Sequence, residues 1–138
     1  MDPKAFKPEG VECILIDEAQ IKIGDKEAWV WLAFEPYRKA FLGFHISFTR
    51  NSLDAWIFLK RLRRRYGFKP IYTNGGSWYP LACKWARLRR YRYSKEWQNL
   101  MERAIQALMI TFLAGAKRII AKPGMHGIGL AYSKSGIT

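Results

Sequence analysis

The sequence predicts a single α/β domain in which a mixed five-stranded sheet is flanked by helices. Three apolar, β-branched runs near the start of the chain are separated only by short turns, as in an antiparallel meander. Later runs repeat apolar residues at helical spacing and alternate with shorter strand-like runs. The length of 138 residues and the hydrophobic content of 49% suffice for one domain with a sizeable core.

The first strand is predicted over 11–23, and it is apolar on both sides, as expected of a central strand that is buried on two faces. Gly24-Asp25 supplies a turn, and two further strands follow over 28–34 and 40–49. Because the connections are short, we expect these three strands to be antiparallel neighbours.

A helix capped by Asn51 or Ser52 and ended by Gly67 follows the meander. A fourth strand is reached through this helix and should therefore run parallel to the first. The remaining predicted elements are that strand over 68–73, a helix over 79–88, a short strand over 91–94 and a helix over 96–108. This order is that of the ribonuclease H-like, or retroviral-integrase-like, fold.

The charge favours a polyanionic partner, because the formal net charge is +13. Residues 60–95 hold twelve Lys or Arg and no Asp or Glu, interleaved with Tyr and Trp. Basic groups neutralise phosphates and aromatic rings stack on unpaired bases, although such rings also serve as core residues with solvated Arg beside them. The candidate phosphate contacts in this block are Arg61, Arg64, Arg65, Lys84, Arg87 and Arg89.

The two cysteines, Cys13 and Cys83, have no metal-ligand spacing. The first ten residues lack the apolar run of a signal peptide, and no stretch approaches the roughly 20 apolar residues of a membrane helix. We therefore expect a reduced, cytoplasmic protein without a membrane partner.

Asp17 is the strongest single signal of a functional site, since an Asp in an apolar strand is rare unless it is paired or binds a metal. Glu18 should point to the opposite face of the sheet and be solvated. His45 lies in a predicted strand and is expected to be structural.

Three stretches carry a resemblance to a known family: 15–18 around Asp17, 71–80 around Thr73-Asn74-Gly75, and 99–103 around Glu102. Together they resemble the catalytic core of DDE transposases of bacterial and archaeal insertion sequences, and most closely the sixth insertion-sequence family. In that family the central strand ends in Thr-Asp-Gly, followed by an aromatic residue, Tyr and Pro. Here Asn74 stands where that family has its second aspartate.

The resemblance implies a catalytic and metal-binding triad of Asp17, Asn74 and Glu102 that would hold Mg²⁺ or Mn²⁺ for DNA cleavage and strand transfer. It also makes Arg103 a candidate DNA contact, and it implies insertion-sequence terminal repeats, another copy of the chain or an intact transposase as partners. Because an amide brings no charge, Asn74 should weaken metal binding and leave little activity. A non-catalytic DNA-binding or transposase-associating module and an unrelated nuclease of the same fold are the alternatives.

The resemblance covers 11–108, whereas 1–10 has the composition of a linker or fragment end. Codons permitted for 109–132, read one nucleotide earlier, can encode two further motifs of that family in order, DDHFPCR and HAWNWISL. We therefore predict that 109–138 is a frameshifted tail. The helix should run on through Phe112 and Leu113, and order should be poor beyond Pro123-Gly124.

Overall fold

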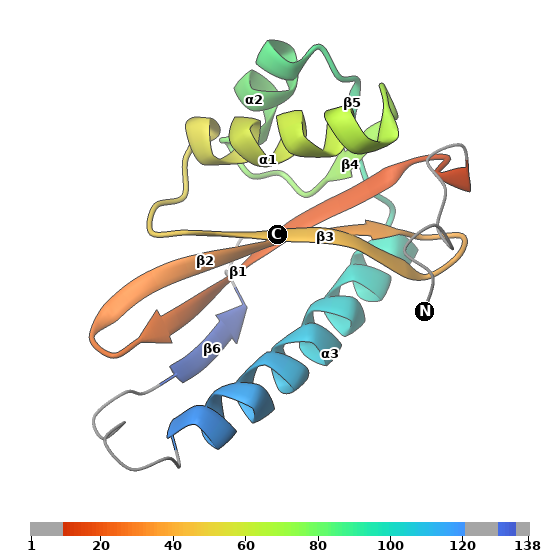
Figure 1. Cartoon of the computed structure of the whole chain (residues 1–138). Coiled ribbons are helices and arrows are strands. Elements are labelled where there is room, and N and C mark those ends of the chain that lie inside the picture. The colour runs from red at the N-terminus through yellow and green to blue at the C-terminus, as the bar shows by residue number, and fades with distance from the viewer. Residues whose placement is uncertain (1–9, 121–129, 135–138) are drawn as a thin grey trace.

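The computed structural model of this chain describes residues 10–120 and 130–134. Figure 1 shows the strands crossing the middle of the molecule, with helices on both sides. The strands are β1 (Ile14–Ile23), β2 (Lys26–Glu35), β3 (Ala40–Ser47), β4 (Ile71–Thr73), β5 (Arg90–Arg92) and β6 (Leu130–Lys134). The helices are α1 (Ser52–Tyr66), α2 (Tyr79–Ala86) and α3 (Lys95–Ile120).

The strand order is β3-β2-β1-β4-β5, so β1 lies at the centre of the sheet. The first three strands pair antiparallel, because each connection between them is a short turn. β4 is reached through α1 and pairs parallel with β1, and β5 pairs parallel with β4. The predicted mixed sheet is confirmed, as are the antiparallel meander of the first three strands and the parallel pairing of β4 with β1.

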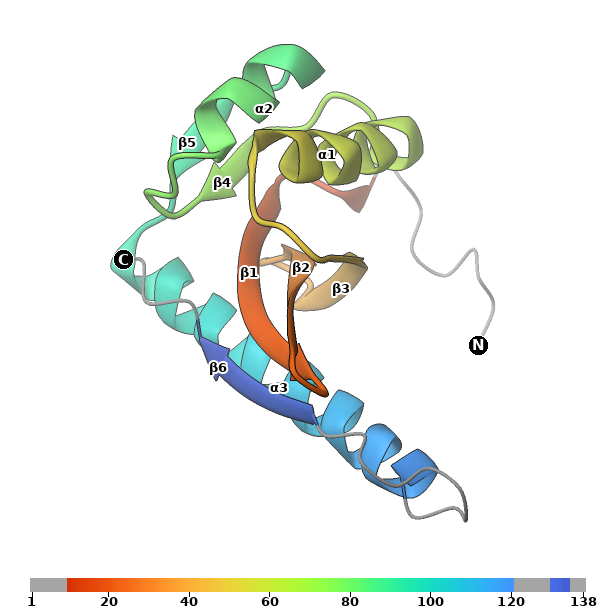
Figure 2. The ribbon, with the colours of Figure 1, turned by 90° about the vertical axis from the view of Figure 1, so that its left-hand side faces the viewer.

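The helices divide between the two faces of the sheet (Figure 1). Viewed along the perpendicular direction in Figure 2, α1 and α2 lie on one side of β1 and α3 on the other. One hydrophobic cluster joins Ile14, Ile16 and Trp31 to α1 and α2, and a second joins Leu15 and Leu32 to α3. Alternation along β1 therefore sends even-numbered side chains toward α1 and α2 and odd-numbered ones toward α3.

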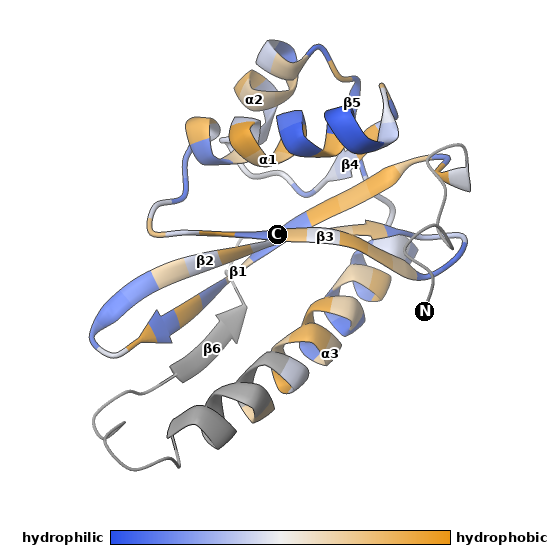
Figure 3. Cartoon of the chain, in the orientation of Figure 1, coloured by the Kyte–Doolittle hydropathy of each residue, from blue (hydrophilic) through white to orange (hydrophobic). Residues whose placement is uncertain are grey.

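α1 begins and ends at the residues that its sequence indicates. The Asn51 side chain accepts a hydrogen bond of 2.9 Å from the backbone N–H of Asp54, which satisfies a donor of the first turn. Gly67 ends the helix at a φ of 85°, a backbone conformation that glycine adopts without strain. Figure 3 shows hydrophilic residues gathered toward the C-terminal half of α1, where the last turn carries Arg63, Arg64 and Arg65.

The chain after Leu108 continues the fold. α3 runs on to Ile120, which includes the extension predicted through Phe112 and Leu113. β6 lies in the segment for which we predicted poor order, and it pairs antiparallel with β1 from Ala19 to Ile23. The frameshifted origin of 109–138 stays a prediction that the gene sequence would test. The predicted linker at 1–10 lies almost wholly outside the described residues.

None of the helices in the described ranges has both the length and the apolar character needed to span a membrane.

Candidate functional site

The candidate site lies where β1 and β4 separate. β4 pairs with β1 at Ile14 and Leu15, and β6 occupies the same edge of β1 only from Ala19 onward. Asp17 lies in the gap between these two pairings. Asn74 follows the last residue of β4, and side-chain alternation directs both residues toward α3. The fork in the sheet therefore brings two distant polar residues to one place.

The Asp17 and Asn74 side chains are both buried and are hydrogen bonded to each other. The Nδ2 atom of Asn74 donates to Oδ1 of Asp17 over 3.1 Å, and the same oxygen accepts from the backbone N–H of Glu18 over 2.8 Å. The other end of the amide, Oδ1 of Asn74, accepts from the backbone N–H of Gly76 over 2.8 Å. The amide thus bridges a carboxylate on β1 and the turn that follows β4.

Gly76 is required for this turn because a side chain there would have no space. A Cβ atom at Gly76 would lie 2.7 Å from the Trp78 ring and 3.1 Å from Oδ1 of Asn74. The absence of a side chain lets the backbone N–H approach the Asn74 amide closely. Gly76 is therefore part of the site's geometry.

Tyr93 lies beside Asp17 and was not predicted as a site residue. Its backbone N–H donates to the carbonyl of Thr73 over 3.2 Å, which places it level with Asn74. Burial raises the pKa of Tyr93 far above its ordinary value, and the charges of Asp17, Glu18 and Glu102 and a hydrogen bond to Asp17 raise it further. The phenol therefore stays protonated and donates to the Asp17 carboxylate.

Glu102 lies on α3 and is half-buried, one residue after the fully buried Met101. Its charge contributes to the raised pKa of Tyr93. The fold thus brings Glu102 to the same face of the sheet as Asp17 and Asn74. Within residues 10–120 and 130–134, no group of three or more His, Cys, Asp or Glu side chains is arranged to hold a metal ion.

The prediction that Glu18 is solvated is wrong. Glu18 does point to the opposite face from Asp17, but it is fully buried against α1 and α2. Its carboxylate accepts a hydrogen bond of 2.5 Å from the Tyr79 hydroxyl and lies 3.7 Å from a guanidinium nitrogen of Arg50. Arg50 in turn lies over the rings of Trp29 and Trp78, at 4.0 and 4.2 Å from their centroids. Helices cover this face of the sheet, which is why the side chain is not solvated.

The predicted phosphate contacts lie in several places. Arg64, Arg87 and Arg89 line hollows at the end of β4 remote from Asn74. Arg61 bonds Nδ1 of His45 over 3.1 Å, and Arg65 donates to the Tyr66 hydroxyl over 3.1 Å. Two others are exposed, Lys84 on α2 and Arg103 on α3. The fold therefore gathers only some of these cations on one surface.

His45 has the structural role that we expected. Its ring stacks on Phe58 with centroids 6.0 Å apart, and burial followed by the nearby Arg61 charge lowers its pKa. The neutral imidazole is part of the packing between β3 and α1.

A divalent ion does not fit between Asp17 and Asn74 as they stand. Such an ion needs ligand oxygens, but the amide presents its NH₂ group to Asp17 and its oxygen to Gly76. An ion that bridged the two side chains would have to break both hydrogen bonds and turn the amide over.

Register in the sheet places Tyr93 at the site once the pairing of β4 with β5 is known from the structure. Thr73 is the partner of Arg92, so the next residue on each strand, Asn74 and Tyr93, lies at the same level. No comparable signal exists for Arg50, which follows β3 and reaches Glu18 only through the packing of Trp29 and Trp78.

No family model matches the chain. Over 72 residues it is 43% identical to the uncharacterized protein MJ0017 of Methanocaldococcus jannaschii, a match that covers 51% of this chain and 34% of that protein. The chain thus spans about a third of the length of this relative.

Among solved structures, the chain is similar to a chain in the cryo-EM structure of the simian T-cell lymphotropic virus intasome in complex with PP2A regulatory subunit B56 gamma. The TM-score is 0.69 at 14% identity, over 85% of this chain and 45% of that chain. At this identity the likeness concerns the fold alone. It confirms the ribonuclease H-like, integrase-like fold that the order of elements predicts.

Proposed function

We propose that this chain is a catalytic core of the DDE transposase type and that it binds DNA. In this core, Asn74 disables metal-dependent DNA cleavage and strand transfer. The observation that carries the proposal is the hydrogen bond between Asn74 and Asp17, at the fork of β1 and β4. An integrase-like fold and a strongly basic composition are consistent with DNA as the partner.

The charge at the site explains why the amide would matter. Phosphodiester cleavage by two metal ions uses several carboxylates to hold the ions against the reacting oxygens. Asp17 and Glu102 supply two carboxylates here, and Asn74 supplies none. Its NH₂ group also gives Asp17 a donor that replaces part of what a cation would provide.

A non-catalytic DNA-binding module is the second candidate, and the hydrogen bonding of Asn74 favours it. The amide uses both of its ends, one on Asp17 and one on Gly76, so the site is satisfied without an ion. In this case selection would act on the basic surface and on association with other chains. Asp17 and Glu102 would then be remnants of an earlier activity.

Calorimetric titration with Mn²⁺ tests the proposal directly. We expect Asn74→Asp to bind Mn²⁺ and the unaltered chain to bind it weakly or not at all, because the change restores a carboxylate where the resemblance places one. The same preparations should then be assayed for Mn²⁺-dependent nicking of supercoiled plasmid DNA. We expect nicking from Asn74→Asp only.

Two controls make the result specific. Asn51→Asp introduces the same chemical change at an exposed helix cap, where Asp is as acceptable as Asn, and it should bind no Mn²⁺. Adding Asp17→Asn to Asn74→Asp should abolish the gained binding. If Asn74→Asp binds no Mn²⁺, the triad is misassigned; if the unaltered chain binds as tightly as the variant, Asn74 does not disable the site.

A further inference from the structure

We infer that the surface at the N-terminal end of β4 binds an unpaired nucleotide of a polynucleotide strand, with Phe68 as a stacking platform and Arg87 as a phosphate contact. The inference deepens the proposed function by naming the form of nucleic acid that is bound, and it rests on that function only for the class of partner. It requires no catalysis at Asp17.

Two adjoining hollows make up this surface, which we call the β4 groove. One has a volume of about 570 Å³ and the other of about 310 Å³, and Phe68 and Arg87 line both. The larger is lined by Lys60, Arg63, Arg64, Phe68, Trp85 and Arg87. Among the residues that the structure describes, no carboxylate lines either hollow, so their lining presents several cations to a ligand without a compensating acid.

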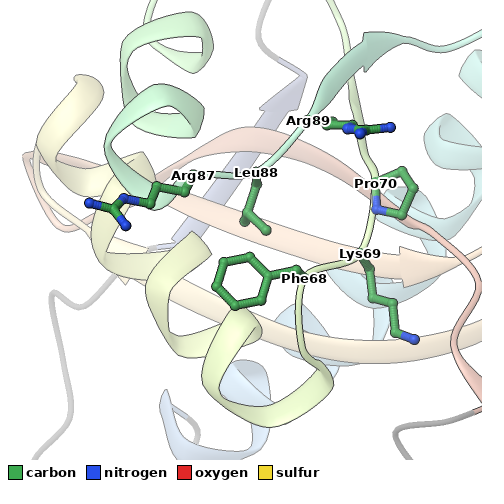
Figure 4. A pocket seen from close by; sticks show the side chains of 6 residues that line it. All are labelled: Phe68, Lys69, Pro70, Arg87, Leu88 and Arg89. Carbon is green, nitrogen blue, oxygen red and sulfur yellow. The ribbon is translucent and has the colours of Figure 1, made fainter.

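The smaller hollow combines an apolar floor with cations at its sides. Figure 4 shows the side chain of Leu88 directed toward the Phe68 ring, with Arg87 and Arg89 on either side. Phosphates carry charge that Arg neutralises, whereas a base offers a flat apolar face. A nucleotide has both features in one molecule and therefore matches this lining.

Two large aromatic side chains of the groove are exposed. Phe68 is 69% exposed, although it follows α1 within a well-packed domain, and Trp85 on α2 is 47% exposed. Arg63 lies over the Phe68 ring at 5.3 Å and donates to the carbonyl of Ala86, which fixes the C-terminal ends of α1 and α2 to each other. The groove is thus held by contacts between the two helices.

The backbone of Arg87 is a second, independent observation. Arg87 caps α2 with φ 58° and ψ 39°, the left-handed conformation in which glycine is the usual residue. A side chain here carries a steric cost, and such a cost is commonly found where a residue has a function. Glycine would adopt this backbone conformation without the steric cost that Arg87 carries.

The groove lies apart from the candidate catalytic site. Phe68, Lys69 and Pro70 precede β4, whereas Asn74 follows it. The extended chain rises through four residue steps from Pro70 to Asn74, which is roughly 13 Å. A strand bound in the groove would therefore approach the Asp17 site from the opposite end of β4.

Stacking distinguishes unpaired from paired nucleic acid. Bases in a duplex are stacked on one another and do not present a face to a protein ring, whereas unpaired bases do. We therefore expect Phe68 to contribute to binding of a single strand and not to binding of a duplex, and Arg87 to contribute to both through phosphate.

Fluorescence anisotropy with the full chain tests this, using labelled oligothymidylate and a labelled duplex of the same length. Phe68→Ala should weaken binding of oligothymidylate about 5- to 150-fold and leave duplex binding unchanged. Phe48→Ala is the matched control, because Phe48 is 65% exposed and lies in a hollow lined by Lys26 and Glu27, away from the groove. It should change neither affinity.

Arg87→Gly separates binding from folding. It removes a charge and relieves the left-handed backbone, so the melting temperature should hold or rise while the affinity for oligothymidylate falls and the salt slope decreases by about 0.7. Lys39→Gly makes the same charge change at the other left-handed residue, which has φ 52° and lies in the turn between β2 and β3. It should leave the affinity unchanged.

The outcomes of these binding experiments test the groove inference and the proposed function separately. Equal losses for Phe68→Ala and Phe48→Ala, or an equal loss on duplex, would overturn the inference and leave the proposed function standing. If the full chain binds neither oligonucleotide, the groove inference and the DNA-binding part of the proposed function both fail. The titration with Mn²⁺ remains a separate test of the catalytic part.

Discussion

Asp17 and Glu18 are neighbours on β1, yet their carboxylates lie on opposite faces of the sheet in different surroundings. Glu18 faces α1 and α2, where it pairs with Arg50 and accepts from the Tyr79 hydroxyl. Asp17 faces α3, where its carboxylate accepts hydrogen bonds from the Asn74 amide, the Glu18 backbone N–H and the Tyr93 phenol. Both are buried acids in one strand, but the elements that cover them differ.

The different surroundings indicate a structural role for the Glu18 carboxylate and a role in the candidate site for the Asp17 carboxylate. A buried acid that is matched by a cation lying between two tryptophan rings holds elements of the fold together, and removing it leaves a charge without its partner. A buried acid at a fork in the sheet, near a second acid on α3, has the position of a site residue. We therefore expect Glu18 to govern stability and Asp17 to govern ligand binding.

The largest expected effect is that of Glu18→Gln. The change removes the negative charge opposite Arg50 while the shape of the side chain is kept, and we expect a loss of about 2–3 kcal/mol in the free energy of unfolding, reduced because Arg50 retains some contact with solvent. Urea unfolding measures it. Glu27→Gln, at an exposed position of β2, is the control, and a loss of similar size there would remove the contrast.

Asn74→Asp should have the next largest effect on the free energy of unfolding, and we expect that effect only in the absence of metal. It would place two buried carboxylates about 3 Å apart, which raises the pKa of one of them above its unfolded value and costs about 1–3 kcal/mol at neutral pH. Because the folded pKa is raised, the loss should shrink as the pH falls through it.

Thermal unfolding of Asn74→Asp with and without Mn²⁺ checks this second prediction. We expect the ion to restore the melting temperature of the variant and to leave that of the unaltered chain unchanged. If the variant is as stable as the unaltered chain at neutral pH without metal, the two side chains do not lie together.

The smallest predicted effect is a pH dependence of stability that comes from two buried thiols, Cys13 and Cys83. Burial raises the pKa of Cys13 to about 11, with a further contribution from Glu35 and Glu12, and burial, opposed by the Arg90 charge, raises that of Cys83 to about 11. Both thiols ionise near 9.0 in the unfolded chain. The folded state therefore keeps protons that the unfolded state loses, and stability should fall as the pH rises from 9 toward 11.

We expect this loss to be about 1 kcal/mol per thiol at pH 10. Urea unfolding at pH 7 and pH 10 measures this loss. The double variant Cys13→Ala with Cys83→Ala is the control, and its free energy of unfolding should fall less between the two pH values. An identical pH dependence in the double variant would mean that other groups produce the fall.

Much of the fold followed from the sequence alone. Short turns fix the first three strands as an antiparallel meander, because no crossover of two or a few residues can join parallel strands. The apolar run around Asp17 identified a buried acid, since a carboxylate in such a strand has to be satisfied inside the protein. The resemblance of three short stretches supplied Asn74 and Glu102.

The tertiary structure decided what covers each face. Alternation along β1 shows that Asp17 and Glu18 point in opposite directions, but it cannot show whether water or a helix lies beyond them. The burial of Glu18, its pairing with Arg50 and the position of Tyr93 depend on contacts between residues far apart in the sequence. In the same way, the β4 groove exists only because α1 and α2 end side by side, which brings Phe68 and Arg87 to one surface.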